Sequence, residues 1–439
     1  MKNNRFVSRL FSLSVLALSC CLNSNARADL QAGAARVDIT PDPHTMVTPL
    51  GGYAARKSAP ATGVHDKVYS RAIVLANGTT KIAIVSVDLC FLPASAKAEI
   101  VKRVTLAGVS GLNAENIVIA ATHSHTSPDP LAMHSANLSK MKGWTSYVPE
   151  LAQFEEERIA GSIILAAHRL MPARLGIGTL DCTGLNKNRR NEKITDPTMT
   201  LVRVTDIQGR SMGAIVNFAA HPTLYDDKMM EISADWPGAM SGWLETTMGG
   251  DAVALFLNGA EGDASPDGVL GATPSDRVAN YGTNLAQRAW DVLRLMQMHS
   301  EVPISYRRIA WDLPERKPNA LFVLAARSFG ATMAQSKQIV NQLMPEKTTL
   351  GLFSVGDVTF LTTPCEPSGE LGLSIKSAMT KSGIKMPAIV ALADDWIAYA
   401  LTREQYHEGN YEAGMSFYGD GLGGSLLTTV ERGLLPHQP

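Results

Sequence analysis

Short apolar runs alternate with longer amphipathic segments along most of the 439-residue chain. Runs of β-branched and aliphatic residues predict strands at 68–76, 81–87, 116–121, 199–204, 213–218, 252–257, 304–311, 358–362 and 388–392. Apolar residues at helical spacing predict helices at 95–106, 149–170, 275–296 and 367–379. Because strands and helices alternate, we predict an α/β protein with mixed β-sheets and flanking helices, built as a single large domain.

Local signals add detail to two of these elements. Asn77-Gly78, between the first two predicted strands, is typical of a β-hairpin turn. Ser95 is the expected N-cap of the first predicted helix, because its hydroxyl can accept a hydrogen bond from a free backbone N–H. We therefore expect a hairpin followed by a helix in the N-terminal part of the domain.

The first 28 residues have the three parts of a secretory signal peptide. Three cationic residues precede an apolar run at 11–18, and Ala26-Arg27-Ala28 follows as a cleavage site. The run is too short to cross a bilayer, and no later stretch reaches about 18 consecutive apolar residues, so we predict no transmembrane segment. We expect a periplasmic or secreted protein in which residues 29–439 form the mature domain. Lipid attachment at Cys20 or Cys21 is a less favoured alternative.

Composition and charge narrow the class of protein. Hydrophobic residues make up 45% and charged residues 18%, as in a folded globular protein, and the formal net charge is −1. Without a basic excess, nucleic acid is not an expected partner. Cleavage after residue 28 leaves Cys90, Cys182 and Cys365, so at most one disulfide can form and one thiol stays unpaired.

Candidate chemistry lies at the ends of predicted strands. The strand at 116–121 leads into Thr122-His123-Ser124-His125, where alternate side chains point the same way, so His123 and His125 can face one cavity. A second apolar strand ends at His221, and Pro222 forces the chain to turn there. Histidines at two strand ends predict a metal site at a sheet edge. Two unrelated buried histidines are the alternative.

Two further strand ends are ambiguous by themselves. The segment 260–267 contains Ser265 among Gly, Asp and Pro, which is consistent with a loop that approaches a ligand and with a plain surface turn. Glu366 follows the strand at 358–362 and is equally consistent with a helix N-terminal carboxylate and with a metal ligand.

Six segments taken together resemble the catalytic domain of the neutral (non-lysosomal) ceramidase family, over nearly the whole chain after residue 28. They are Thr122-His123-Ser124-His125, Asn188-Arg189 followed by Asp196-Pro197-Thr198-Met199-Thr200, Ala219-Ala220-His221-Pro222-Thr223, Gly262-Asp263-Ala264-Ser265-Pro266, Pro364-Cys365-Glu366 followed by Gly369 or Gly372, and Tyr399 to Tyr406 followed by Asn410-Tyr411-Glu412. Cys365 stands where the family has glycine, and Pro367 follows Glu366 directly. The resemblance does not extend to the C-terminal immunoglobulin-like domain usual in the family.

The resemblance implies one zinc ion per chain, held by His123, His221, Glu366 and Tyr399. Two imidazoles, a carboxylate and a phenolate leave room for water or a substrate oxygen, as a catalytic zinc site requires. Coordination to a dication would depress the pKa of the tyrosine, as it does for bound water.

The resemblance also implies roles for four residues around the metal. His125 would transfer protons, Arg189 would lie near the scissile amide, and Tyr411 would be an active-site tyrosine. Ser265 corresponds to the active-site serine, either as nucleophile or as a positioning group. We favour attack by zinc-activated water over attack by Ser265, because the sequence offers no evident partner for a serine triad.

The expected activity is hydrolysis of an N-acyl amide, with ceramide giving a fatty acid and a sphingoid base. The expected partner is therefore a small amphiphilic lipid or N-acyl amide, with peripheral membrane contact. A zinc esterase or an amidase for a non-sphingolipid substrate is the main alternative, since fold and metal do not fix the bond that is cleaved. A non-catalytic binding protein is the third hypothesis.

Overall fold

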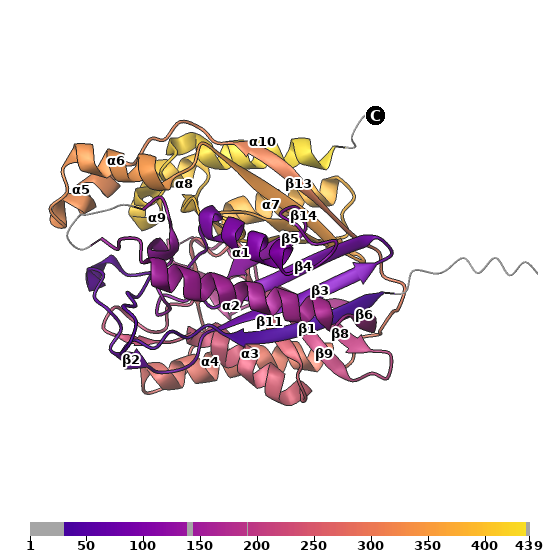
Figure 1. Cartoon of the computed structure of the whole chain (residues 1–439). Helices are drawn as coiled ribbons and strands as arrows, with labels where there is room; N and C mark the ends of the chain where they lie inside the picture. The colour runs from indigo at the N-terminus through magenta and orange to yellow at the C-terminus, as the bar shows by residue number, and fades with distance from the viewer. Residues whose placement is uncertain (1–29, 138–143, 191, 436–439) are drawn as a thin grey trace, which may run out of the picture.

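Two β-sheets and their helices form four stacked layers in the computed structural model, which describes residues 30–137, 144–190 and 192–435 (Figure 1). The predicted signal peptide lies outside these residues. The larger sheet has eight strands in the order β11 (Val253–Asn258), β9 (Ser211–Phe218), β8 (Thr198–Asp206), β6 (Met171–Asp181), β1 (Gln31–Asp38), β3 (Tyr69–Asn77), β4 (Thr80–Val87), β5 (Ile117–Ala121). Only its outer pairs, β4–β5 and β9–β11, are parallel.

The smaller sheet has four strands in the order β13 (Ile304–Asp312), β14 (Lys347–Val355), β15 (Val358–Thr362), β17 (Met386–Val390). Its last pair is parallel and the other two are antiparallel. The predicted mixed-sheet α/β fold is therefore confirmed.

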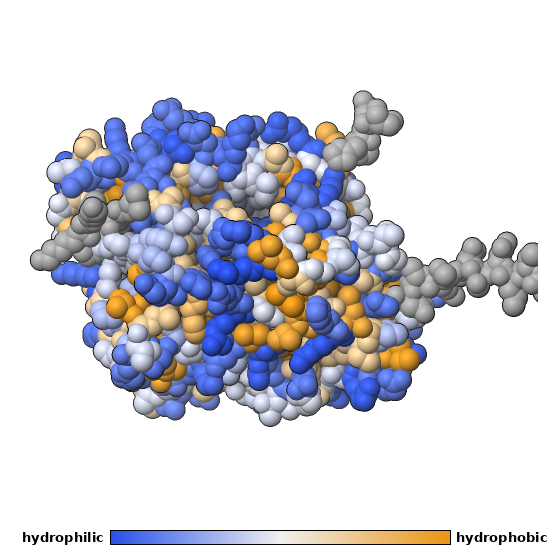
Figure 2. All heavy atoms as spheres, in the orientation of Figure 1, coloured by the Kyte–Doolittle hydropathy of each residue, from blue (hydrophilic) through white to orange (hydrophobic). Residues whose placement is uncertain are grey.

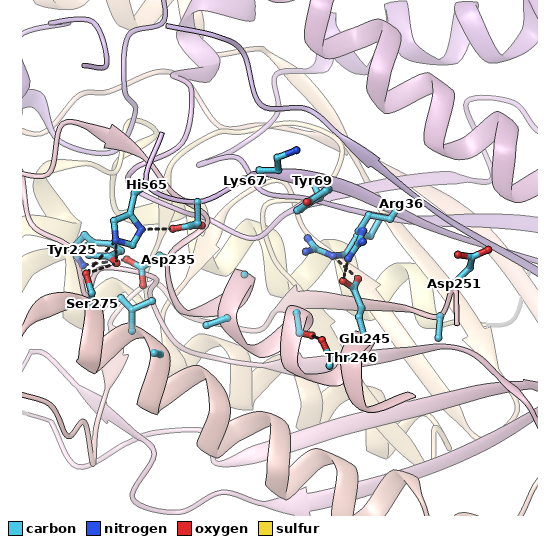
Figure 3. Close-up of a pocket in the computed structure, with 18 of the residues that line it drawn as sticks. Arg36, His65, Lys67, Tyr69, Tyr225, Asp235, Glu245, Thr246, Asp251 and Ser275 are labelled. Carbon is cyan, nitrogen blue, oxygen red and sulfur yellow. Dashed lines mark hydrogen bonds and ion pairs between the residues drawn. The ribbon is translucent and has the colours of Figure 1, made fainter. Parts of the chain in front are cut away.

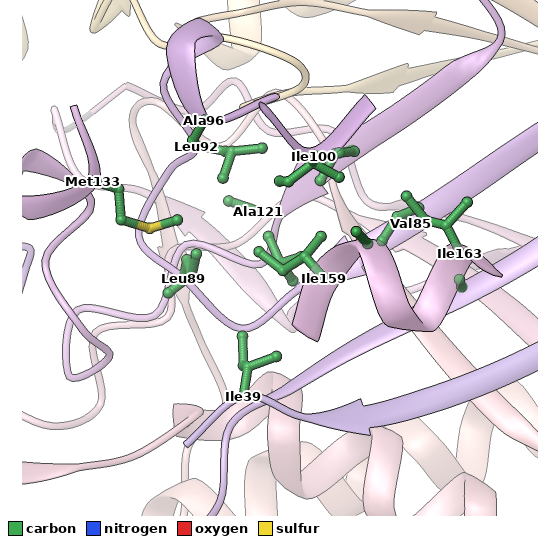
Figure 4. Close-up of a cluster of buried hydrophobic side chains, with 14 of the residues drawn as sticks. Ile39, Val85, Leu89, Leu92, Ala96, Ile100, Ala121, Met133, Ile159 and Ile163 are labelled. Carbon is green, nitrogen blue, oxygen red and sulfur yellow. The ribbon is translucent and has the colours of Figure 1, made fainter. Parts of the chain in front are cut away.

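Side chains on β3, β4 and β5 alternate between two cores. Ala72 and Val74 of β3 face the helices α1 (Ala94–Leu106) and α2 (Pro149–His168), whereas Ile73 and Leu75 face the smaller sheet. The core beneath α1 and α2 is a compact set of aliphatic side chains (Figure 4). Burial on both faces explains why these strands read as continuous apolar runs.

The remaining long helices complete the outer layers. α3 (Asp235–Met248) and α4 (Pro274–Leu293) cover the other half of the helix-bearing face of the large sheet, while α7 (Gly369–Lys381) and α10 (Leu422–Leu434) cover the small sheet. Figure 2 shows that the face carrying α1 and α2 is largely polar, with apolar residues interspersed around these helices. None of the helices in the described residues is long and apolar enough to cross a membrane.

Short elements connect the layers and frame the site described below. They are three two-strand pairs, β2 (Gly63–Val64) with β10 (Glu231–Ile232), β7 (Asn186–Asn188) with β12 (Ala264–Pro266), and β16 (Glu366–Pro367) with β18 (Tyr399–Ala400), and four helices, α5 (Ala320–Ser328), α6 (Met333–Leu343), α8 (Arg403–Glu408) and α9 (Asn410–Gly414).

The large sheet curls so that its two edge strands, β5 and β11, approach each other. β11 lies against β3, β4 and β5 as well as pairing with β9. Ser86 of β4 donates to the carbonyl of Phe256 in β11 at 2.6 Å, across this approach. The curl brings the ends of β5 and β9 together although they lie near opposite edges of the sheet.

Several sequence predictions need correction. The first helix begins at Ala94 with Pro93 as its N-cap residue, so Ser95 lies inside the helix and is not its cap. The strands β1, β6 and β14 and the helix α3 were not predicted; β1 reads as small residues mixed with charges, and α3 carries Pro237-Gly238 near its start. Cys90, Cys182 and Cys365 are all buried free thiols, so the one disulfide that the sequence allowed is not formed among them.

Candidate active site

Four side chains from distant parts of the chain converge on one buried point. His123 Nε2 lies 3.2 Å from His221 Nε2 and 3.2 Å from Glu366 Oε2. His221 Nε2 lies 3.5 Å from Glu366 Oε2 and 3.1 Å from the Tyr399 hydroxyl. All four residues are buried. The structure thus brings together the full set of zinc ligands that the sequence resemblance implies.

Each of these side chains lies at the start of a strand or just after the end of one. His123 follows β5 in a left-handed conformation with φ of 76°, and His221 follows β9. Glu366 and Tyr399 begin β16 and β18 and face each other in the parallel register of that pair. The site is therefore held between the edge of the large sheet and the strand ends of the small one.

Asn258, the last residue of β11, ties the two histidine segments together. Its side-chain amide donates to the carbonyl of Thr122 at 3.4 Å and to the carbonyl of Ala220 at 3.2 Å. These two carbonyls directly precede His123 and His221. A single buried amide therefore fixes the spacing of both histidine backbones, and no sequence pattern singled it out.

The hydrogen bonds of the two histidines fix their tautomers. His123 Nδ1 lies 2.6 Å from the Cys90 carbonyl, and His221 Nδ1 lies 2.7 Å from the Glu261 carbonyl. A carbonyl only accepts, so each Nδ1 carries a proton and each Nε2 is the atom that a cation would take. The two Nε2 atoms lie 3.2 Å apart, and both face Glu366 Oε2.

The carboxylate completes this electron-rich cluster. Glu366 Oε1 accepts a hydrogen bond from Trp396 Nε1 at 3.0 Å, whereas Oε2, which faces the histidines, has no hydrogen-bond donor among the described residues. Although burial alone would raise the pKa of Glu366, the His123 imidazole holds it well below its usual range. Burial lowers the pKa of His221 to about 3, so this imidazole is neutral. Although burial alone would lower the pKa of His123, Glu366 raises it well above its usual value, so zinc would displace the second proton of this imidazole.

His125 lies beside the cluster and lines the same cavity. Its Nε2 is 3.1 Å from His123 Nε2, and its buried Nδ1 has no partner among the described residues. Burial lowers the pKa of His125 well below its usual value. Gly52 packs against the His125 ring, and a Cβ added at Gly52 would lie only 2.4 Å from His125 Cγ. His125 is thus a neutral, rigidly held imidazole next to the metal position.

Arg189 is the cation nearest to this group of donors. Its Nη2 donates to the Tyr399 hydroxyl at 3.1 Å, and its Nε donates to Glu412 at 2.7 Å. Tyr411 is 58% exposed, and its ring lies 5.8 Å from that of Tyr399, centroid to centroid. Both predicted residues therefore lie next to the candidate ligand Tyr399.

The structure places Ser265 differently from the other predicted residues. It lies in β12, opposite Lys187 of β7, and its neighbour Ala264 accepts a hydrogen bond from the His221 backbone at 2.9 Å. No described contact links the Ser265 hydroxyl to the cluster, and the residue does not line the cavity above it. The backbone of the Ser265 segment supports the site, but the structure does not bring its hydroxyl to the converging donors.

The cluster opens into a cavity of about 360 Å³ with mainly apolar walls. Helices α5 and α6, which the sequence analysis did not predict, supply much of one wall. The larger apolar side chains that line the cavity are Phe91, Leu131, Trp144, Phe322, Phe329, Ile339, Leu343, Met344, Trp396, Met415 and Phe417. A buried polar centre at the base of an apolar cavity suits a reactive polar group attached to a hydrocarbon chain.

Comparison with known proteins identifies the family. The model of the N-terminal part of neutral/alkaline non-lysosomal ceramidases matches residues 30–285, more than half of the chain. A neutral ceramidase of Drosophila pseudoobscura pseudoobscura is 27% identical over 60% of this chain and 39% of that protein, so the chain spans less than half of that relative. The neutral ceramidase of Pseudomonas aeruginosa is 23% identical over 95% of this chain and 73% of its own length.

A solved structure matches the whole architecture. The crystal structure of neutral ceramidase from Pseudomonas aeruginosa superposes with a TM-score of 0.79 at 19% identity, covering 94% of this chain and 76% of that one. At this identity the likeness establishes the fold. With the family model over residues 30–285, it shows that the chain belongs to the neutral/alkaline non-lysosomal ceramidase family.

Proposed function

We propose that this protein is a zinc-dependent amidohydrolase that cleaves the N-acyl amide bond of ceramide-like lipids to give a fatty acid and a sphingoid base. The observation that carries the proposal is the convergence of His123, His221, Glu366 and Tyr399 at an apolar cavity, with contacts of 3.1–3.5 Å that link the four side chains. Membership of the family supports the same substrate class.

Zinc fits the donor set, because two imidazole nitrogens and a carboxylate oxygen, the donors that zinc takes, converge in a buried group within 4.8 Å of one another. When bound, zinc would lower the pKa of water and polarise the amide carbonyl. We assign one ion per chain to the four ligands. Because a phenol must lose its proton to bind strongly, the neighbouring Arg189 cation would assist Tyr399 as a ligand.

The protein's own groups account for proton transfer and charge stabilisation. His125 is neutral and lies in the cavity, so its imidazole can accept the proton that the attacking water loses and deliver it to the leaving amine. Without that proton the C–N bond breaks poorly. The Arg189 guanidinium does not line the cavity and donates to Tyr399, Glu412 and the Gly262 carbonyl, so its charge would act on the reaction through Tyr399. Tyr411 lines the cavity, so its hydroxyl can donate to the carbonyl oxygen, where negative charge develops during attack.

The test combines metal analysis with a substrate panel. Purified protein should contain about one zinc per chain and hydrolyse N-acylsphingosine, and a chelator should abolish this activity. His221→Ala should lose both metal and activity, while His44→Ala, which changes an exposed histidine, should keep both. Full activity in metal-free protein would contradict the proposal. Faster turnover of esters or of amides without a sphingoid base would keep the zinc chemistry but replace the substrate.

We also propose that the protein is exported after cleavage behind Ala28. The support is the pattern of residues 1–28, which precede the first described strand. The N-terminal sequence of exported protein should begin at Asp29. A mature form that begins at an acylated Cys20 or Cys21 would show a lipoprotein instead.

A further inference from the structure

A second cavity, of about 740 Å³, lies among β1, β3, α3 and the start of α4 (Figure 3). It shares no lining residue with the cavity above the metal ligands. Its walls combine polar and apolar surface, with Arg36, Lys67, Thr246 and Asp251 among the lining side chains. The proposed ceramidase activity does not use this cavity.

A hydrogen-bonded relay of three side chains lies at one end of this cavity. Asp66 Oδ2 lies 2.9 Å from His65 Nδ1. His65 Nε2 lies 3.2 Å from Ser275 Oγ, and Figure 3 shows these two side chains together. A carboxylate on Nδ1 holds the proton there, so Nε2 faces the serine hydroxyl as a base. This order of atoms is the one that activates a serine nucleophile.

The carboxylate of the relay is itself held in place. Asp66 Oδ2 accepts a hydrogen bond from the Ser233 hydroxyl, and Asp66 Oδ1 accepts one from the Ala234 N–H at 2.9 Å. Both donors come from the loop that leads into α3. The orientation of His65 is therefore fixed by supporting hydrogen bonds, as a general base requires.

Ser275 also has hydrogen-bond donors beside it. It is the second residue of α4, whose first turn is closed by a capping box between Thr273 and Asp276. First-turn N–H groups have no intrahelical partner, and the helix N-terminus favours negative charge. The Tyr225 hydroxyl donates to Ser275 Oγ at 3.2 Å. The Ser275 N–H and the Tyr225 O–H can therefore both reach an oxyanion that forms on a carbonyl attacked by Ser275.

We propose that Ser275, His65 and Asp66 form a second, metal-independent hydrolytic site that cleaves small polar esters. Ser275 Oγ attacks the ester carbonyl while His65 Nε2 takes its proton, and the bond to the leaving alcohol breaks as His65 returns that proton to the alcohol oxygen. Water then attacks the acyl-serine with His65 as base, which releases the carboxylic acid and restores Ser275. The charged side chains of Arg36, Lys67 and Asp251 in the walls of the cavity favour a small polar ester over a lipid.

A fluorophosphonate probe tests this site in the full-length, chelator-treated protein, where metal-site hydrolysis is suppressed. Peptide mass spectrometry should find the probe on Ser275. Ser275→Ala should lose the label, and His65→Gln should slow labelling and p-nitrophenyl acetate hydrolysis by roughly 10³-fold or more, as loss of a triad member does. Thr246→Ala, which removes another hydroxyl from the same cavity, should label like the wild type.

Two results would overturn the proposal. The first is folded wild-type protein that carries no probe on Ser275, a result that depends on no variant. The second is an unchanged labelling rate in His65→Gln. In either case the three side chains would only tie the start of α4 to the segment around residue 65, and Ser275→Ala would show that role as a lower unfolding temperature.

Discussion

Trp396→Phe tests how far the proposed metal site depends on a residue that does not touch the metal. The Trp396 indole donates to Glu366 Oε1 at 3.0 Å, and its ring stacks on Phe91 with centroids 4.2 Å apart and an interplanar angle of 15°. Phenylalanine keeps an aromatic ring in the stack and removes only the N–H donor. The substitution therefore separates the hydrogen bond from the packing.

The expected loss of zinc affinity in Trp396→Phe follows from the burial of the Glu366 carboxylate. Glu366 is 2% exposed, so water cannot easily replace the lost donor. Removing a partner that orients a metal ligand typically costs about 10–100-fold in metal affinity, which corresponds to about 1.4–2.8 kcal/mol. A hydrogen bond to a charged group is worth about 1.5–3 kcal/mol, which agrees with that range. We expect zinc affinity to fall by this factor and activity to recover when zinc is in excess.

Competition between metal-free protein and a chromophoric chelator would measure the affinity directly. Trp144→Phe is the matched control, because Trp144 lines the same cavity but its buried indole nitrogen has no hydrogen-bond partner among the described residues. The reasoning would be refuted if Trp396→Phe bound zinc as tightly as the wild type, or if Trp144→Phe lost as much affinity.

Three further predictions test other parts of the structure. Gly52→Ala places a Cβ against the His125 ring at a residue with φ of +85°, so the ring must shift. Zinc content should stay normal, while kcat should fall at least about tenfold because proton transfer by His125 is impaired. Metal analysis and steady-state kinetics would measure both, and a normal kcat would contradict the role of His125. Burial alone would raise the pKa of Asp394, but Lys97 and Arg308 hold this pKa below its usual value. The ionised carboxylate therefore stabilises the fold above about pH 4, and this stabilisation is lost as the pH falls through the lowered pKa. Asp394→Asn should have a lower unfolding temperature at neutral pH and a weaker dependence of that temperature on pH below about pH 4, and parallel curves of unfolding temperature against pH for the variant and the wild type would contradict this. Ser265→Ala should retain zinc, and quenched wild-type turnover mixtures should contain no acyl group on Ser265 by mass spectrometry.

The elements that the sequence predicted well are those buried on both faces. The strand predicted at 358–362 is β15 with the same bounds, and the predicted hairpin joins β3 to β4 through Gly78, which has φ of +59°. Elements with weak local signals were missed. β1 contains mostly small residues and charges, and its place in the centre of the large sheet is set by pairing with β3, which no local pattern encodes.

The four residues that converge at the candidate site were named from the sequence, but their geometry was not predicted. Histidines at two strand ends suggested one sheet edge, yet β5 is an edge strand and β9 lies next to the opposite edge. The pairing order arises from contacts between segments far apart in the chain, so the periodicity of the sequence could not give it. Trp396 and Asn258 were missed for the same reason, since each acts through a hydrogen bond across the fold.

The curl of the large sheet and the cation-binding geometry depend on each other. In a flat sheet, β5 and β9 would be separated by the width of five intervening strands at about 4.8 Å per step, and His123 could not meet His221. The buried amide of Asn258 holds the two histidine backbones together, with the two Nε2 atoms 3.2 Å apart. A bound cation would join these two nitrogens and the Glu366 carboxylate directly. The packing of the two sheets therefore brings the ligands together before the metal binds. Because the metal binds only to the folded arrangement, its binding would in turn stabilise the curled sheet.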